Sequence, residues 1–192
     1  MTLEHKGAQK RIYISDAAYF ITVKTLHNEP FFEERIFCDV FVEELRVCKQ
    51  LKGYELYGWV LVYDHFHFLI KPNGTFNYSQ IMKSLKENVS CSINRIIDPE
   101  GATPASRLQE IYANKYDIFG LQSKFQQIHP TFDTFARFHW QKSFHDHYCR
   151  NEMDLRNHLE YMIDNLYHHP LPRDWPYVFT NPKYATLLDS WS

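Results

Sequence analysis

The order in which two hydrophobic periods alternate along the chain limits the fold more than any other feature. Apolar residues recur with period 2 in strand-like segments and with a period near 3.6 in helical ones. In chain order the first patterns predict a strand, a helix, two strands and a helix, over residues 17–25, 34–52, 54–63, 65–71 and 78–96. Gly53 supplies the stop for the first helix, and Asp64 separates the paired strands.

The second half of the chain completes this order. Residues 135–149 are rich in aromatics and predict a fourth strand, after which Asn151 can cap a third helix. The resulting order of strand, helix, strand, strand, helix, strand and helix predicts an α+β fold: a ferredoxin-like split β-α-β antiparallel sheet with an added C-terminal helix. Residues 98–134 have no sustained period and are interpreted as an insertion, with one short helix near residues 106–114.

Length and composition favour one compact domain over residues 1–192. The chain is 44% hydrophobic with only 6 glycines, which suits a single buried core. The longest apolar stretch, residues 56–63, falls well short of the roughly 20 residues that cross a bilayer, and residues 1–11 lack the apolar core of a signal peptide. Four dispersed cysteines argue against a disulfide framework or a thiolate zinc site. We therefore expect a cytoplasmic protein without a membrane partner.

Charge is distributed unevenly along the chain. The formal net charge is −2, so no global basic field indicates a nucleic-acid partner. Between residues 65 and 97, however, four bases stand against one acid, a local balance of 4 − 1 = +3. Within the second predicted helix, Lys83, Lys86 and Arg95 fall outside the apolar stripe. They predict a basic surface for solvent or a partner.

His65 and His67 give the sharpest chemical signal. Residues i and i+2 of a strand share a face about 7 Å apart, so both rings can converge on one cation while Phe66 and Phe68 anchor the opposite face. The same pattern also fits two hydrogen-bonded histidines beside a sheet. Two imidazoles leave a divalent ion with open positions, and such positions suit a phosphate oxygen.

Tyr161 and Asn165 form a second pattern, one turn apart on the third predicted helix. They lie about 40° apart around the helix axis, on a face that also carries Asp154, His158 and His168. Such a polar face is commonly only solvated. It also has chemical capacity, because the Asn165 carbonyl is a hard oxygen ligand and the Tyr161 phenol is a potential nucleophile.

These motifs together resemble the single-tyrosine HUH transposases of insertion sequences, and most closely the REP-associated tyrosine transposases. The resembling segments are residues 19–22 (YFIT), 62–70 (VYDHFHFLI), 81–86 (IMKSLK), 140–150 (WQKSFHDHYCR), 161–165 (YMIDN) and 174–177 (DWPY). They cover nearly all of the chain outside residues 98–134. Two single-residue departures stand out: Leu166 follows Asn165 where the family often has proline, and Asp64 precedes His65 where asparagine is usual.

The resemblance implies a metal-dependent tyrosine transposase that nicks and joins DNA. In that family pattern, His65, His67 and Asn165 hold Mg²⁺ or Mn²⁺, and Tyr161 attacks the scissile phosphate of single-stranded DNA to give a 5′-phosphotyrosine. The DNA is expected to carry hairpins. Its expected contacts are Lys83, Lys86, Arg95 and Arg150.

Two other functional hypotheses stay open from the sequence. The first is a catalytically inactive nucleic-acid-binding module on the same fold, to which the mild acidity lends weight. The second is an unrelated metal-dependent hydrolase in which His145 and His147 join His65 and His67 at the ion. The sequence leaves undecided whether the protein acts as a monomer or a homodimer, and whether Tyr161 serves its own site or a partner's.

Overall fold

The computed structural model describes residues 11–98, 118–130 and 135–191. These parts of the chain contain a four-stranded antiparallel sheet in the order β2-β3-β1-β4. The strands are β1 (Tyr19–Lys24), β2 (Glu55–Leu61), β3 (His65–Lys71) and β4 (His145–Tyr148). With one helix after β1 and another after β3, this is the order of the ferredoxin-like fold, and it confirms the predicted fold class.

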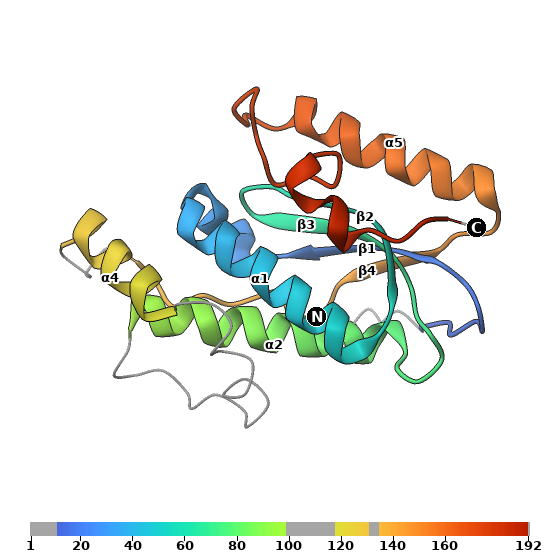
Figure 1. Cartoon of the computed structure of the whole chain (residues 1–192), viewed down its shortest axis with the longest axis horizontal. Helices are drawn as coiled ribbons and strands as arrows, with labels where there is room; N and C mark the ends of the chain where they lie inside the picture. The colour runs from blue at the N-terminus through green and yellow to red at the C-terminus, as the bar shows by residue number, and fades with distance from the viewer. Residues whose placement is uncertain (1–10, 99–117, 131–134, 192) are drawn as a thin grey trace, which may run out of the picture.

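Helices cover both faces of the sheet. Figure 1 shows α1 (Arg35–Lys52) and α2 (Tyr78–Ile97) on one side and α5 (Glu152–His168) on the other. The larger core cluster lies between the sheet and α1 and α2 and contains the side chains of Ile21, Phe66 and Phe68. A smaller cluster joins Phe20 and Leu69 of the sheet to the apolar residues of α5. The added C-terminal helix is therefore the layer that covers the second face.

Polar side chains set the ends of these helices. The Asn77 and Gln80 side chains form a capping box at the start of α2, and the Asn151 side chain accepts from the backbone N–H of Asp154 at 2.9 Å at the start of α5. The helix α1 ends at Gly53, whose φ of 64° lies in the left-handed region that glycine tolerates. The Gly53 stop and the Asn151 cap were predicted from the sequence, whereas the capping box at the start of α2 was not.

The predicted fourth strand is too long. Of residues 135–149, only β4 pairs continuously with β1, and Trp140 makes a single isolated bridge to Thr25. The Asn94 side chain binds both the N–H and the carbonyl of Phe138, at 2.8 and 3.0 Å, while the Trp140 indole N–H donates to the Lys86 carbonyl. This segment packs its aromatic rings into the core, and part of its backbone hydrogen bonding is to side chains instead of to a strand.

Part of the predicted insertion is described. Residues 99–117 and 131–134 lie outside the described residues, and the helix expected near residues 106–114 lies among them. Within the insertion, α4 (Ile118–Ile128) contacts α2 and places Phe125 in the main core cluster. This segment of the insertion therefore packs against the body of the fold, and the single domain over residues 1–192 stays a prediction.

The C-terminal segment runs along the outer edge of β2. The backbone N–H of Leu61 donates to Tyr177, while those of Phe179 and Asp189 donate to Trp59 and Leu56, at distances of 2.9 to 3.0 Å. Three short 3-10 helices complete the described structure: η1 (Leu26–Asn28), η2 (Phe31–Glu33) and η4 (Pro182–Leu187). None of the described helices is long and apolar enough to span a membrane. The cytoplasmic location stays a prediction.

Candidate active site

The two histidines of β3 lie on the sheet face that α5 covers. His67 is opposite Thr22 of β1, and His65 is opposite Lys24. His65 and His67 are 6% and 3% exposed, and their ring centroids are 4.8 Å apart. Phe66 and Phe68 point to the other face, as the alternation predicted. The expected same-face histidine pair is therefore present, and it is buried.

His67 is fixed by hydrogen bonds at both ring nitrogens. Its Nδ1 lies 2.8 Å from Thr22 Oγ1, and its Nε2 lies 2.8 Å from Asn165 Nδ2. The amide N–H donates to Nε2, which leaves Nδ1–H to donate to the threonine. Burial, reinforced by the charges of His65 and His169, lowers the pKa of His67 to about 3. The ring is therefore neutral at physiological pH, the form in which imidazole binds a metal.

His65 is oriented by a carboxylate. Its Nδ1 lies 2.6 Å from Asp64 Oδ1, which leaves Nε2 as the nitrogen available to a ligand. Partial burial raises the pKa of Asp64, but the hydrogen bond and charge of His65 outweigh it and bring the pKa below its usual value. A carboxylate on the second nitrogen of a metal-binding histidine fixes its tautomer and increases its basicity. The aspartate that replaces the usual asparagine suits this role.

Tyr161 lies directly beside the histidine pair. Its ring packs edge-to-face on His67, with centroids 5.4 Å apart, and on Phe20 at 5.9 Å. The residue is nevertheless 48% exposed, whereas Asn165, one turn further along α5, is 3% exposed. The structure thus brings Tyr161, Asn165, His65 and His67 together. Of these four side chains, only that of Tyr161 is exposed to solvent.

The donor set around His67 fits a divalent cation. Two imidazoles of β3 and one amide of α5 lie next to one another, and the amide nitrogen is already hydrogen-bonded to His67 Nε2. Rotation of the Asn165 side-chain amide by about 180° would present its hard carbonyl oxygen at the same place. These three side chains can therefore offer two nitrogens and one oxygen to a divalent cation such as the expected Mg²⁺ or Mn²⁺.

The predicted basic residues lie mostly across the sheet from this group. Lys83, Lys86 and Arg95 belong to α2 on the opposite face (Figure 1). Lys83 is exposed, but the ammonium of Lys86 donates to the Gln141 carbonyl at 2.8 Å, and burial lowers the pKa of Lys86. Arg150 is exposed immediately before α5. The structure therefore does not place the α2 bases beside Tyr161.

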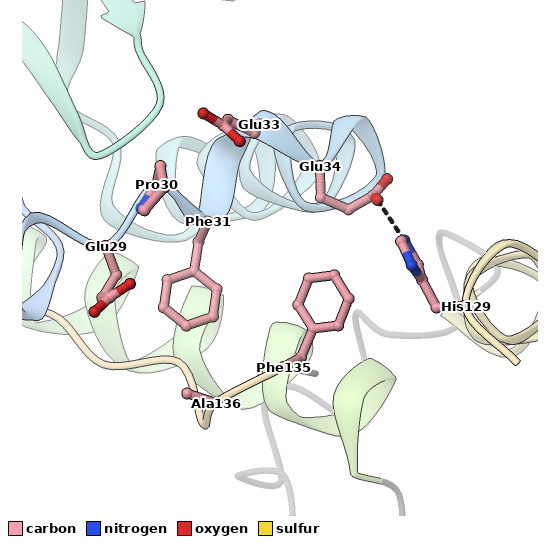
Figure 2. Close-up of a pocket in the computed structure, with 8 residues that line it drawn as sticks. All are labelled: Glu29, Pro30, Phe31, Glu33, Glu34, His129, Phe135 and Ala136. Carbon is pink, nitrogen blue, oxygen red and sulfur yellow. Dashed lines mark hydrogen bonds and ion pairs between the residues drawn. The ribbon is translucent and has the colours of Figure 1, made fainter. Parts of the chain in front are cut away.

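A separate pocket of about 430 Å³ lies between the start of α1 and the end of α4. Figure 2 shows its lining, in which Glu34 and His129 form an ion pair at 2.7 Å. The remaining lining residues are Glu29, Pro30, Phe31, Glu33, Phe135 and Ala136. None of the predicted site residues lines this pocket, and its three glutamates do not suit a nucleic-acid phosphate.

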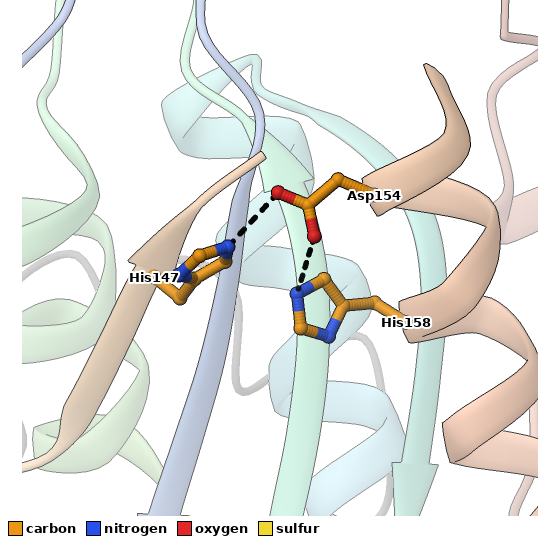
Figure 3. A group of neighbouring side chains, drawn as sticks. All are labelled: His147, Asp154 and His158. Atoms are coloured by element: carbon orange, nitrogen blue, oxygen red, sulfur yellow. Dashed lines mark hydrogen bonds and ion pairs between the residues drawn. The ribbon is translucent and has the colours of Figure 1, made fainter. Parts of the chain in front are cut away.

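A third group of side chains was not anticipated. Figure 3 shows the carboxylate of Asp154 between the imidazoles of His147 and His158. His147 comes from β4 and the other two residues come from α5, so the group depends on how the helix sits over the sheet. The i, i+4 spacing of Asp154 and His158 was visible in the sequence, whereas their proximity to His147 was not.

The position of His147 in this group is relevant to the hypothesis of a metal-dependent hydrolase with four histidine ligands. His147 contacts Asp154 and not the His65–His67 pair, and His145 is exposed at the start of β4. The ring of Phe20 stacks on both His67 and His158, with centroids 5.3 and 4.2 Å apart, and so links the two groups. The four histidines that the hydrolase hypothesis requires at one ion do not come together in the structure.

The fold and the site together define a structural class of protein. Its features are a ferredoxin-like sheet, a buried histidine pair and a tyrosine-bearing helix packed over that pair. The sequence matches the family model described as "Transposase IS200 like" over residues 15–129, which is more than half of the chain. The protein belongs to the IS200-like transposase family, as the resemblance in the sequence indicated. The matched residues include both histidines, whereas α5 follows them.

Two solved structures are similar to this chain. The REP-associated tyrosine transposase bound to a REP hairpin is 18% identical, with a TM-score of 0.61 over 97% of this chain and 91% of that chain. A putative transposase from Deinococcus radiodurans R1 is 15% identical, with a TM-score of 0.43 over 84% of this chain and 96% of that one. The first likeness supports the fold assignment and extends over α5. No curated protein matches the sequence.

Proposed function

We propose that this transposase cleaves and rejoins single-stranded DNA through a covalent bond to Tyr161. The observation that carries the proposal is the double contact of α5 with His67, which meets the Asn165 amide and the Tyr161 ring. The residues proposed as nucleophile and metal ligand are one turn apart on α5, and both contact His67. Geometry of this kind places a nucleophile beside an activated phosphate.

His65, His67 and Asn165 would hold Mg²⁺ or Mn²⁺. The bound ion would polarise the scissile phosphate and offset the negative charge that develops on it. Thr22 and Asp64 keep the two imidazoles in the required tautomers. The sheet and α5 bury the pair, whereas Tyr161 beside it is 48% exposed.

The chemical step is a transesterification at phosphorus. The Tyr161 oxygen, having lost its proton, forms a bond to phosphorus as the bond from phosphorus to the 3′ oxygen breaks. That oxygen takes up a proton and leaves as a free 3′-hydroxyl, while the tyrosine retains the 5′-phosphate. Because the energy of the phosphodiester is kept in this link, attack by another 3′-hydroxyl joins new ends without ATP.

We further propose that the substrate is single-stranded DNA that carries a hairpin. The similar REP-associated transposase is bound to a REP hairpin, and the two chains share a fold over nearly their full length. Arg150 lies exposed beside the start of α5 and is the proposed phosphate contact nearest to the site. Lys83, Lys86 and Arg95 would act only on DNA that reaches across the sheet to α2.

The test is formation of a covalent adduct with hairpin-bearing single-stranded DNA and Mn²⁺, separated by denaturing electrophoresis. Wild type should give a shifted band that EDTA abolishes, and peptide mapping should find the DNA on Tyr161. Tyr161→Phe should lose the band. Tyr167→Phe, the same change at an 83% exposed position of α5, should keep it.

Two results would count against the proposal. A DNA-linked peptide that contains another tyrosine would transfer the nucleophile role away from Tyr161. Hairpin binding with no adduct in wild type, with Mn²⁺ present and across a pool of hairpins, would favour the catalytically inactive binding module.

A further inference from the structure

We propose that His147, Asp154 and His158 form a second metal site, which takes a transition-metal dication such as Zn²⁺. The site would be separate from the His65–His67 pair. Two imidazoles and one carboxylate form a frequent three-ligand set for this class of ion. The proposal concerns a different group of atoms from the one assigned to DNA cleavage and does not depend on Tyr161 being the nucleophile.

The distances suit one small cation. His147 Nε2 lies 3.0 Å from Asp154 Oδ2, His158 Nε2 lies 3.6 Å from Asp154 Oδ1, and one ligand atom from each residue lies within 4.8 Å of the others. Tetrahedral zinc with bonds of about 2.0–2.1 Å separates its ligand atoms by about 3.3 Å. The distances from the two imidazoles to the carboxylate lie close to that value, whereas the limit of 4.8 Å for the whole group exceeds it, so the side chains must move closer together to share one ion.

One nitrogen in this group makes no hydrogen bond within the described residues. His158 Nε2 is buried and makes no hydrogen bond to any described residue, since the Asp154 oxygen is beyond hydrogen-bond distance. Leaving a buried polar atom unpaired destabilises the fold, and metal coordination would remove that cost. The ring itself is held in place by stacking on Phe20 at 4.2 Å and 9°.

The protonation states agree with metal binding. Burial, together with the nearby His147, lowers the pKa of His158 and favours its neutral form. The hydrogen bond from His147 and that from the Arg150 backbone N–H lower the pKa of Asp154 and keep it ionised. The Arg150 N–H, 3.1 Å from Asp154 Oδ2, also orients the carboxylate as outer hydrogen bonds do in known metal sites.

Two imidazoles and a carboxylate suit Zn²⁺, Co²⁺ or Ni²⁺, because imidazole is a good ligand for late transition metals. An ion here would tie β4, a strand of four residues at the sheet edge, to α5 one turn before Tyr161. The site would therefore hold the helix that carries the proposed nucleophile in place over the sheet.

The experiment is a titration of the metal-free full-length chain with Zn²⁺ alone, read as the number of equivalents bound. His158→Phe keeps the stacking on Phe20 but removes both nitrogens, and it should bind one equivalent fewer than wild type. His168→Phe makes the same change at an exposed position of α5 and should bind as wild type does. Zn²⁺ should also raise the melting temperature of wild type more than that of His158→Phe.

His147→Ala changes a residue whose side chain is 39% exposed and gives an independent measure if His158→Phe does not fold. It should lose the same single equivalent. Equal stoichiometry in wild type and in the folded cluster variants, or no Zn²⁺ binding by wild type, would overturn the proposal. Because the readout is binding, a failure of the DNA cleavage proposal would leave this result unaffected.

Discussion

The two faces of the sheet are formed by the same strands but differ in the kind of side chain that they bury. On the face toward α1 and α2, Phe66, Phe68 and Ile70 of β3 are fully buried among apolar neighbours. On the face toward α5, the alternate residues His65 and His67 are also buried but are held by hydrogen bonds. Strand alternation thus places the apolar residues that stabilise the fold and the histidines proposed to perform chemistry on opposite faces of β3.

The largest loss of stability is expected from the apolar face. Phe68→Ala should lower the free energy of unfolding by about 3–5 kcal/mol, because it removes a buried ring and leaves a cavity. Chemical denaturation measures the change. Tyr161→Phe on the other face should stay within about 0.5 kcal/mol of wild type. If the two variants lost similar stability, the separation of roles between the faces would be wrong.

A smaller loss is expected from the buried polar contact between α5 and β3. Asn165→Ala leaves His67 Nε2 without its partner, which should cost about 1–3 kcal/mol of unfolding free energy and abolish adduct formation. Denaturation and the adduct assay measure the two effects. Asn165→Asp keeps an oxygen at this position and should restore part of the metal-dependent activity. Full activity in Asn165→Ala would remove Asn165 from the proposed metal ligands.

The contact between β2 and α5 should be sensitive to one added methyl group. A Cβ at Gly58 would lie 2.6 Å from a methyl of Leu159 and 2.7 Å from the methyl of Met162. Both atoms end flexible side chains, so Gly58→Ala should cost only about 1 kcal/mol of stability while shifting α5 slightly. The rate of adduct formation should fall more than the melting temperature suggests. An unchanged rate would show that the site tolerates displacement of the helix.

The smallest effect is expected at the exposed surface of α2. Lys83→Ala breaks only an exposed ion pair with Glu87 at 3.8 Å and should change stability by less than about 0.5 kcal/mol. Arg150→Ala, on the α5 side, should weaken hairpin binding and flatten its salt dependence more than Lys83→Ala does. Binding titrations at two salt concentrations compare them. A larger effect at Lys83 would place the DNA across α2.

Local patterns were sufficient to predict much of this site. Alternation placed His65 and His67 on one face, and helical spacing turned Tyr161 away from the apolar stripe. The contact between Asn165 and His67 spans 98 residues and depends on where α5 crosses the sheet. No local period encodes that crossing, so only the family resemblance linked the two residues.

The predictions that failed share a physical cause. The fourth strand was predicted too long because an aromatic-rich segment can either pair with a strand or pack its rings into the core. Here the Asn94 side chain binds the backbone of Phe138, which favours the second arrangement. Lys86 was predicted to be free for solvent or a partner because its helical position is polar, yet a chain segment 54 to 55 residues away covers it. In each case a distant segment overrides a local preference.

The segment that runs along β2 also covers one edge of the sheet. Unprotected sheet edges recruit strands from other molecules, and β2 is apolar along most of its length. The backbone bonds from Tyr177, Phe179 and Asp189 occupy hydrogen-bonding groups that an intruding strand would use. A chain shortened before Tyr177 should therefore aggregate through β2 even where its histidine pair remains intact, and solubility would then report on this edge.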